Sequence, residues 1–322
     1  MRIALPPVDP AAFGRRAAGA GVVRLSGETM GTSWSAQLVA PPPELAIALR
    51  KALARMIAAM SQWDPGSALS AFNASPVGAW RDVPDTLAVV LDAALAIRDA
   101  SGGAFDPAGG ALADLWGFGP AGPRHDLPDA AAIADALGRS GADGIDLSGG
   151  RVRRARDVRL DLSGIGKGYA VDALAATCRA HGCADVLVEI GGEFVGSGIQ
   201  PNGQPWWVDL ESPPGLALSP LRIAAHGIGI ATSGDYRRFL DAEGRRLGHT
   251  IDPRTGWPVA NGIVSVSVVA ADCMTADGWA TALTVLGREA GLALAGRLGL
   301  AARFVTDDGG EALSPALVEM LA

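Results

Sequence analysis

Residues 161–172 read DLSGIGKGYAVD, a glycine-rich turn that leads into a helix predicted over 169–181. A turn of this kind exposes backbone N–H groups at the positive end of the helix dipole, an arrangement that suits an anion. Lys167 adds a cation to the turn and Ser163 adds a hydroxyl. The same residues also fit an ordinary joint between a strand and a helix, so the segment alone leaves both interpretations open.

Helices and strands alternate irregularly on both sides of this turn. Helical period and composition predict further helices over 44–60, 84–101, 126–141, 274–286 and 289–298. Apolar runs and apolar alternation predict strands within 22–39, 152–162, 186–190, 206–210, 221–225, 227–232, 264–270 and 302–306. Because hairpins interrupt the alternation, we expect an α+β fold in which mixed β-sheets pack with helices around a central cleft.

The domain organisation follows from the length and the evenness of the chain. Its 322 residues are enough to bury a sizeable core without disulfide or metal staples. No long linker, internal repeat or shift in composition divides the sequence. We therefore expect a single domain over 21–322, preceded by a flexible arm over 1–20.

Composition narrows the classes of partner. The chain has 27 basic and 34 acidic residues, a net charge of −7, which argues against nucleic acid because a basic face is usually needed there. One small anionic ligand, held locally, remains compatible with that charge. Apolar residues make up 49% of the chain but never form a run of 18, so we expect no transmembrane segment. The 43 glycines indicate many tight turns or close backbone approaches.

The compartment is predicted from the visible N-terminus and the cysteines. No apolar stretch follows Arg2, and no early cysteine is present to carry a lipid. Cys178, Cys183 and Cys273 form an odd set without the spacing of a disulfide framework, which favours buried, reduced thiols. The chain as written is therefore expected in the cytoplasm, or in the periplasm if a leader has been removed.

A possible metal site lies in the segment MTADGWATAL at 274–283. Asp277 and Thr281 are four residues apart, so they share one face of the predicted helix. A carboxylate and a hydroxyl on one face are hard oxygen ligands, which suit Mg²⁺. In the alternative interpretation Asp277 caps the helix and Thr281 packs in the core.

A polar loop, GHTIDPRTG at 248–256, contains the best candidate for a general base. His249 titrates near neutral pH in its unperturbed state, as a general base should. A solvated hairpin loop is the alternative. Upstream, the segment ATSGDY at 231–236 offers the Ser233 hydroxyl and backbone amides as a plausible phosphate contact.

Three further segments contain side chains suited to a flat heteroaromatic ring. Phe105 and Asp106, beside Gly103, offer stacking and a hydrogen bond. Trp63 is a possible stacking platform, although a buried core tryptophan would look the same. Met30 could lie against such a ring through its thioether.

Several common signatures are absent from the sequence. Residues 161–168 match neither a phosphate-binding P-loop nor a dinucleotide fingerprint, because glycine, serine or threonine is missing at the required places. There is also no His-Glu-x-x-His zinc motif and no Gly-x-Ser-x-Gly nucleophile elbow.

Taken together and in order, these segments resemble the FAD:protein FMN transferase family, the ApbE-type flavin transferases. The matching segments are TMGTSW (29–34), MSQWDPGSALSAFN (60–73), GAFDP (103–107), DLSGIGKGYAVD (161–172), EIGGE (189–193), TSGDY (232–236), HTIDPRTG (249–256) and MTADGWATAL (274–283). Each is weak alone, but their order is specific, and together they span nearly the whole chain.

The resemblance implies a Mg²⁺-dependent enzyme that transfers FMN from FAD to a Thr or Ser hydroxyl of an acceptor flavoprotein and releases AMP. It implies a metal site made by Asp277, Thr281 and the backbone carbonyl of Gly166, where the family often has alanine, and it makes His249 the base. The implied flavin site consists of Met30, Trp63, Ala104, Phe105, Asp106, Ser163, Tyr169 and Ile251. Lys167 and Ser233 join the cofactor-binding candidates from their own segments.

Two other functions remain open on the sequence. A hydrolase with the same site would let water attack FAD and release FMN and AMP. A non-catalytic carrier would bind flavin without turnover, although His249 together with the Asp277 and Thr281 pair favours an enzyme. Neither the acceptor protein nor the oligomeric state is indicated by the sequence.

Overall fold

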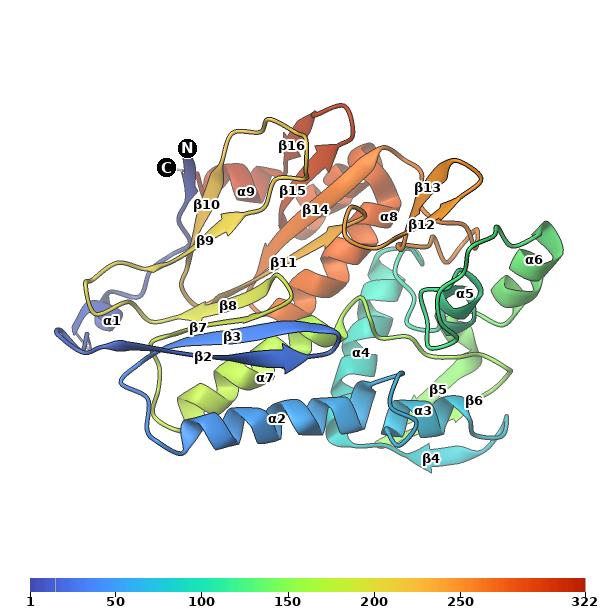
Figure 1. The fold of residues 1–322 in the computed structure, drawn as a ribbon, viewed down its shortest axis with the longest axis horizontal. Coiled ribbons are helices and arrows are strands. Elements are labelled where there is room, and N and C mark those ends of the chain that lie inside the picture. The colour runs from blue at the N-terminus through green and yellow to red at the C-terminus, as the bar shows by residue number, and fades with distance from the viewer. Residues whose placement is uncertain (15, 322) are drawn as a thin grey trace.

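An eight-stranded, fully antiparallel sheet forms the centre of the molecule (Figure 1). The computed structural model describes residues 1–14 and 16–321. The strands of this sheet, in spatial order, are β16 (Glu311–Leu313), β15 (Ala301–Thr306), β14 (Ile263–Ala270), β11 (Ile228–Gly234), β8 (Glu193–Ser197), β7 (Val186–Ile190), β3 (Thr32–Val39) and β2 (Val22–Thr29).

Three smaller sheets surround the central one. The first has the order β1 (Arg2–Ala4), β10 (Leu221–Ala225), β9 (Trp206–Leu210). The second has the order β4 (Trp80–Asp82), β6 (Arg151–Arg154), β5 (Ile145–Ser148). The third is a hairpin of β12 (Phe239–Ala242) and β13 (Arg245–Gly248).

Two long helices, α7 (Gly166–Ala180) and α8 (Cys273–Leu298), pack against the central sheet, and two more, α2 (Leu45–Met60) and α4 (Asp85–Ala100), pack against them. In Figure 1, α2 and α7 run along the end of the sheet that contains β2, β3 and β7, and α8 crosses β11 and β14. The short helices are α1 (Pro10–Gly14), α3 (Ala68–Asn73), α5 (Gly110–Leu115), α6 (Ala130–Gly138) and α9 (Pro315–Glu319), with a 3₁₀ turn at Ala142–Gly144. The α+β class expected from the sequence is confirmed.

The main core lies between these long helices and the sheet. Leu49 of α2, Leu87 of α4 and Leu283 of α8 are fully buried together with Val188 of β7. Burial of apolar surface is the dominant favourable term in folding, so this core holds the helices onto the sheet. No helix in the described part of the chain is both long and apolar enough to cross a bilayer.

Helices α7 and α8 approach each other closely at Gly168. A Cβ atom there would lie 2.3 Å from the Cys273 carbonyl oxygen and 2.8 Å from the Asp277 Cβ, so only glycine fits. The Gly168 N–H donates a hydrogen bond to Asp277 Oδ2 at 2.9 Å. Asp172 of α7 accepts hydrogen bonds from the Cys273 and Met274 N–H groups at 2.9 and 2.8 Å, which satisfies two free donors at the start of α8. The two helices are therefore joined by backbone contacts as well as by side chains.

Several predicted boundaries need correction. The helices predicted over 274–286 and 289–298 are one helix, α8, kinked at Gly287, whose φ is 78°. The strand prediction over 152–162 is wrong beyond Arg154: the Asn73 side chain instead holds Leu160, accepting from its N–H and donating to its carbonyl at 2.8 and 2.9 Å. Strand β8 and the β12–β13 hairpin were not predicted as such.

The N-terminal residues differ from the expected flexible arm. Residues 2–4 form β1, which pairs in parallel with β10, and Ala4 is completely buried. Ala4 also forms a bridge with Leu321, so this segment lies beside the C-terminal one. The single domain over 21–322 stays a prediction.

The glycine at the α7–α8 contact gives a stability test. We expect Gly168→Ala to lower the free energy of unfolding by about 1–3 kcal/mol, the usual cost of overpacking, because the new methyl group would meet the backbone of α8. Gly166→Ala on the same helix is the matched control, since the nearest atom to its Cβ would be 4.0 Å away. It should leave stability unchanged or raise it by up to about 1 kcal/mol through helix propensity. Urea unfolding of both variants measures the difference, and equal stabilities would show that the contact is not tight.

Candidate active site

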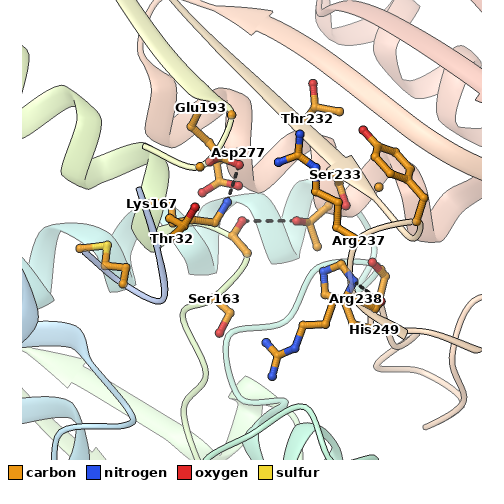
Figure 2. A pocket seen from close by; sticks show the side chains of 18 of the residues that line it. Thr32, Ser163, Lys167, Glu193, Thr232, Ser233, Arg237, Arg238, His249 and Asp277 are labelled. Atoms are coloured by element: carbon orange, nitrogen blue, oxygen red, sulfur yellow. Dashed lines mark hydrogen bonds and ion pairs between the residues drawn. The ribbon is translucent and has the colours of Figure 1, made fainter. Parts of the chain in front are cut away.

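A cavity of about 630 Å³ opens beside the first turns of α7 and α8. Its volume is in the range of sites that bind cofactors. Figure 2 shows Lys167, Glu193 and Asp277 together on one side of this cavity and His249 with Arg238 on the other. The residues proposed from the sequence that line it are Met30, Ala104, Phe105, Asp106, Ser163, Lys167, Ser233, His249, Ile251, Asp277 and Thr281.

Three proposed residues lie outside this lining. Trp63 is 53% exposed, so the alternative of a buried tryptophan is wrong; it lies in a neighbouring hollow of about 330 Å³ that Arg238 also borders. Tyr169 is partly buried and packs against the main core. Gly166 is the first residue of α7 and does not reach the cavity wall.

Asp277 and Thr281 lie side by side on α8, as their spacing predicts. Asp277 is 5% exposed, and Asp272, not Asp277, caps the helix through a bond from the Thr275 N–H, so the capping alternative is wrong. The Thr281 hydroxyl donates to the carbonyl of Gly164 at 3.4 Å. The carbonyl beside this pair is therefore that of Gly164, two residues before the predicted Gly166.

The donors in the turn before α7 are partly used within the protein. The N–H of Gly166 donates to the Leu162 carbonyl at 2.8 Å and that of Gly168 donates to Asp277. Asp161 accepts both the N–H and the hydroxyl of Ser163, at 2.8 and 2.6 Å. A backbone carbonyl and two carboxylates of the protein itself therefore accept from these donors.

Lys167 is engaged with a carboxylate that the sequence analysis did not single out. Its ammonium forms an ion pair with Glu193, the first residue of β8, which is 2% exposed. The sequence signal was present in the segment EIGGE, where a carboxylate follows two glycines. With Asp277 nearby, two carboxylates share one ammonium, so this buried group carries a net charge of −1 when all three are ionised.

Burial and mutual charge shift all three pKa values. Burial raises the pKa of Glu193 to about 7, although Lys167 pulls it down, and Asp277 raises it further. Burial also raises the pKa of Asp277, against the attraction of Lys167. For Lys167, burial alone would lower the pKa, but Glu193 and Asp277 together raise it above its usual value, so the ammonium stays charged. The raised pKa values mean that the protein alone stabilises these two negative charges poorly, and a divalent cation nearby would stabilise them.

The oxygen atoms around Asp277 suit Mg²⁺, provided that a bound substrate supplies further oxygen ligands. Asp277 Oδ2 is used by Gly168, and no hydrogen bond from a described residue reaches Oδ1. The Thr281 hydroxyl and the Gly164 carbonyl add two further hard oxygens. Among the residues that the structure describes, no three His, Cys, Asp or Glu side chains lie close enough to hold a metal. A cation here would therefore need hydroxyl, carbonyl and substrate oxygens, as Mg²⁺ commonly does.

Asp106 has a structural use that differs from the predicted contact with a ring. Its carboxylate accepts from Arg98 Nε at 2.9 Å, from the Ala108 N–H at 2.8 Å and from the Ala142 N–H at 3.1 Å. These bonds fix the loop that brings Ala104 and Phe105 to the cavity. Phe105 is itself buried, so a flat ligand would meet this wall through apolar surface and backbone.

His249 follows β13 and faces the cavity with its imidazole in the neutral form. Its Nδ1 lies 3.2 Å from the Arg238 carbonyl oxygen, which only accepts, so the neutral ring donates from Nδ1 and leaves Nε2 as the free acceptor. The edge of the ring packs against Phe118, with centroids 6.2 Å apart. Burial, followed by the charge of Arg238, lowers the pKa of His249 to about 4. At neutral pH the residue is therefore a base and not an acid.

Comparison with known proteins gives a consistent family. The model of the ApbE family matches residues 30–304. The FAD:protein FMN transferase of Klebsiella pneumoniae is 36% identical over 88% of this chain and 84% of its own, and that of Salmonella typhimurium is 35% identical over the same shares. Among solved structures, the apo form of the flavinyl transferase ApbE from Pseudomonas stutzeri has a TM-score of 0.87 at 34% identity, covering 94% of this chain and 97% of its own. The flavin transferase ApbE from Vibrio cholerae has a TM-score of 0.86 at 33% identity, covering 93% and 99%.

The lowered pKa of His249 gives a direct titration test. An unperturbed histidine gains its proton near pH 6.5, but His249 should remain neutral until the pH approaches about 4. The ring resonances of His249, assigned by their loss in His249→Ala, should therefore not move between pH 8 and pH 5.5 in NMR spectra of the free protein. A midpoint near 6.5 would show that burial does not favour the neutral ring.

Proposed function

The chain belongs to the ApbE family, and we propose that it is a Mg²⁺-dependent FAD:protein FMN transferase that modifies a Thr or Ser hydroxyl of an acceptor protein and releases AMP. The observation that supports this most is the pairing, across one cavity, of a neutral imidazole at His249 with the oxygen ligands Asp277 and Thr281. Its relatives are named for the same transfer, and the chain is a transferase enzyme.

The reaction needs positioning and charge neutralisation more than covalent help from the protein. The acceptor oxygen attacks the phosphorus on the FMN side of the FAD pyrophosphate. The bond from that phosphorus to the bridging oxygen breaks, and AMP leaves with the bridging oxygen. The proton of the acceptor hydroxyl passes to Nε2 of His249, the free acceptor of that ring.

The cation belongs on the side of the cavity opposite His249. Asp277 and Thr281 would hold it together with a carbonyl of the turn 164–166. Bound Mg²⁺ would supply neutralisation of the charge that develops on the phosphoryl oxygens and on the leaving AMP. Met30, Phe105 and Ile251 offer the apolar surface for the flavin, and Ser233 at the end of β11 offers a hydroxyl to a phosphate.

A hydrolase is the second candidate, since water in place of the acceptor hydroxyl would give FMN and AMP from the same site. The names of the relatives favour transfer over hydrolysis. The test is to incubate the protein with FAD, Mg²⁺ and an acceptor domain that has one candidate threonine, and to measure the acceptor mass and the AMP. A gain of one FMN moiety that is lost in the Thr→Ala acceptor supports the transferase. AMP without that gain supports the hydrolase.

Replacing the base separates chemistry from binding. We expect His249→Ala to slow transfer by about 10²–10⁴, the usual contribution of general-base catalysis, while FAD affinity changes little. His125→Ala, at an exposed loop position away from the cavity, is the matched control and should transfer at the rate of the unaltered protein. Single-turnover transfer rates and FAD fluorescence titrations give the two quantities. A His249→Ala variant with full transfer activity would remove the assignment.

Replacing the carboxylate tests the metal side. We expect Asp277→Asn to raise the Mg²⁺ concentration for half-maximal transfer by more than about tenfold, since even outer partners of metal ligands contribute about 10–100-fold to metal affinity. Glu289→Gln, an exposed position on the same helix, is the control for a lost negative charge. If both variants show the Mg²⁺ dependence of the unaltered protein, Asp277 does not hold the cation.

A further inference from the structure

We propose that Glu193 is a positioning residue that holds the Lys167 ammonium away from Asp277 and thereby keeps Asp277 available to a divalent cation. This inference rests on the proposed metal site at Asp277 and Thr281. Glu193 is not a ligand of that site, but it would affect how tightly the site binds the divalent cation.

The arrangement of the three charges carries the proposal. The Lys167 ammonium is attracted electrostatically by both Glu193 and Asp277, but its ion pair is with Glu193. The Asp277 carboxylate instead accepts from the Gly168 N–H through Oδ2. Figure 2 shows the three side chains converging at one side of the cavity, so a rotation of the lysine side chain would exchange one carboxylate for the other. Lysine is a compact charge on a flexible stem, which makes such an exchange easy.

Glu193 is held firmly in the place that this role requires. It begins β8 directly after the turn at Gly191 and Gly192, whose φ angles of 62° and 102° favour glycine. The Gly192 N–H donates to Glu189 Oε1 at 2.9 Å, which fixes the turn. A Cβ at Gly191 would lie 2.9 Å from Thr32 Cγ2 and 3.5 Å from Glu193 Oε2, so the turn also leaves room for the carboxylate.

Glu193 is the member of the pair that needs a partner. Its side chain is 2% exposed, whereas that of Lys167 is 31% exposed, and a buried charge without a partner is strongly destabilising. Glu193 Oε2 has no hydrogen-bond partner among the described residues, which leaves Lys167 as the group that stabilises Glu193 through Oε1. If Glu193 lost its charge, the ammonium would turn to Asp277 and compete there with the divalent cation for the same oxygens.

A double-mutant cycle on cation binding tests the inference. Mn²⁺ serves as the probe, with saturating FAD and no acceptor, and free Mn²⁺ is counted by electron paramagnetic resonance. Asp277→Asn provides the blank for Mn²⁺ held by FAD alone. We expect Glu193→Gln to weaken Asp277-dependent Mn²⁺ binding by about tenfold or more, as loss of an outer partner typically does. Adding Lys167→Met to Glu193→Gln should recover that loss, because no ammonium is left to compete.

The decisive comparison is the effect of Lys167→Met in the two backgrounds. If Glu193 holds the lysine away, Lys167→Met tightens Mn²⁺ binding at least tenfold more in the Glu193→Gln background than in the unaltered protein. Equal effects in both backgrounds would mean that the charges simply add, and would overturn the inference. A purely structural role for Glu193 would lower the unfolding temperature without this coupling.

A second variant and a separate check of the metal site complete the experiment. Should Glu193→Gln fail to fold, Glu193→Asp retains the charge with a shorter reach, and the same cycle with Lys167→Met applies. Weakened Mn²⁺ binding in Glu193→Asp that Lys167→Met does not recover overturns the inference. Absence of Asp277-dependent Mn²⁺ binding in the unaltered protein contradicts the proposed metal site itself, whereas normal binding in Glu193→Gln contradicts only the role of Glu193.

Discussion

The contact between α7 and α8 at Gly168 is the constraint on which the site depends. Only glycine lets the two helices come so close that a backbone N–H of one binds Asp277 of the other at 2.9 Å. That bond holds one carboxylate oxygen of Asp277 in place, and the other oxygen is available to the cavity. Asp172 adds a second link by capping α8 from α7. The oxygen donors of α8 and the lysine of α7 therefore keep a fixed spacing, which positioning catalysis requires.

The electrostatics of the cavity follow from this geometry. One side concentrates buried negative charge at Glu193 and Asp277, only partly balanced by Lys167. The other side carries Arg238 and a histidine whose pKa is lowered to about 4 by burial and by that arginine. A pyrophosphate with a bound cation fits between them, since the cation meets the carboxylates and the imidazole stays free to accept a proton. The overall charge of −7 is compatible with such a ligand because the recognition is local.

Local sequence signals predicted the parts of the site that depend on neighbouring residues. The four-residue spacing of Asp277 and Thr281 placed them correctly on one helix face, and the glycine-rich turn correctly preceded a helix. Contacts between segments that are far apart in the sequence could not be predicted. Lys167 pairs with Glu193 across 26 positions, and the Asp106 carboxylate is used by Arg98 and backbone groups. Nothing local showed that Arg2 would pair beside Leu221 in a sheet. Such contacts come from tertiary packing, whereas periodicity and motif spacing describe only residues that are close in the sequence.

The proposed transfer requires a single cavity to hold the cation at α8 and the reacting phosphorus near His249. A crystal structure with FAD and Mn²⁺, read by the anomalous signal of manganese, tests it most directly. We expect one manganese peak bonded to Asp277, Thr281 and pyrophosphate oxygens, with the FMN-side phosphorus facing Nε2 of His249. A peak elsewhere, or a pyrophosphate outside this cavity, would contradict it.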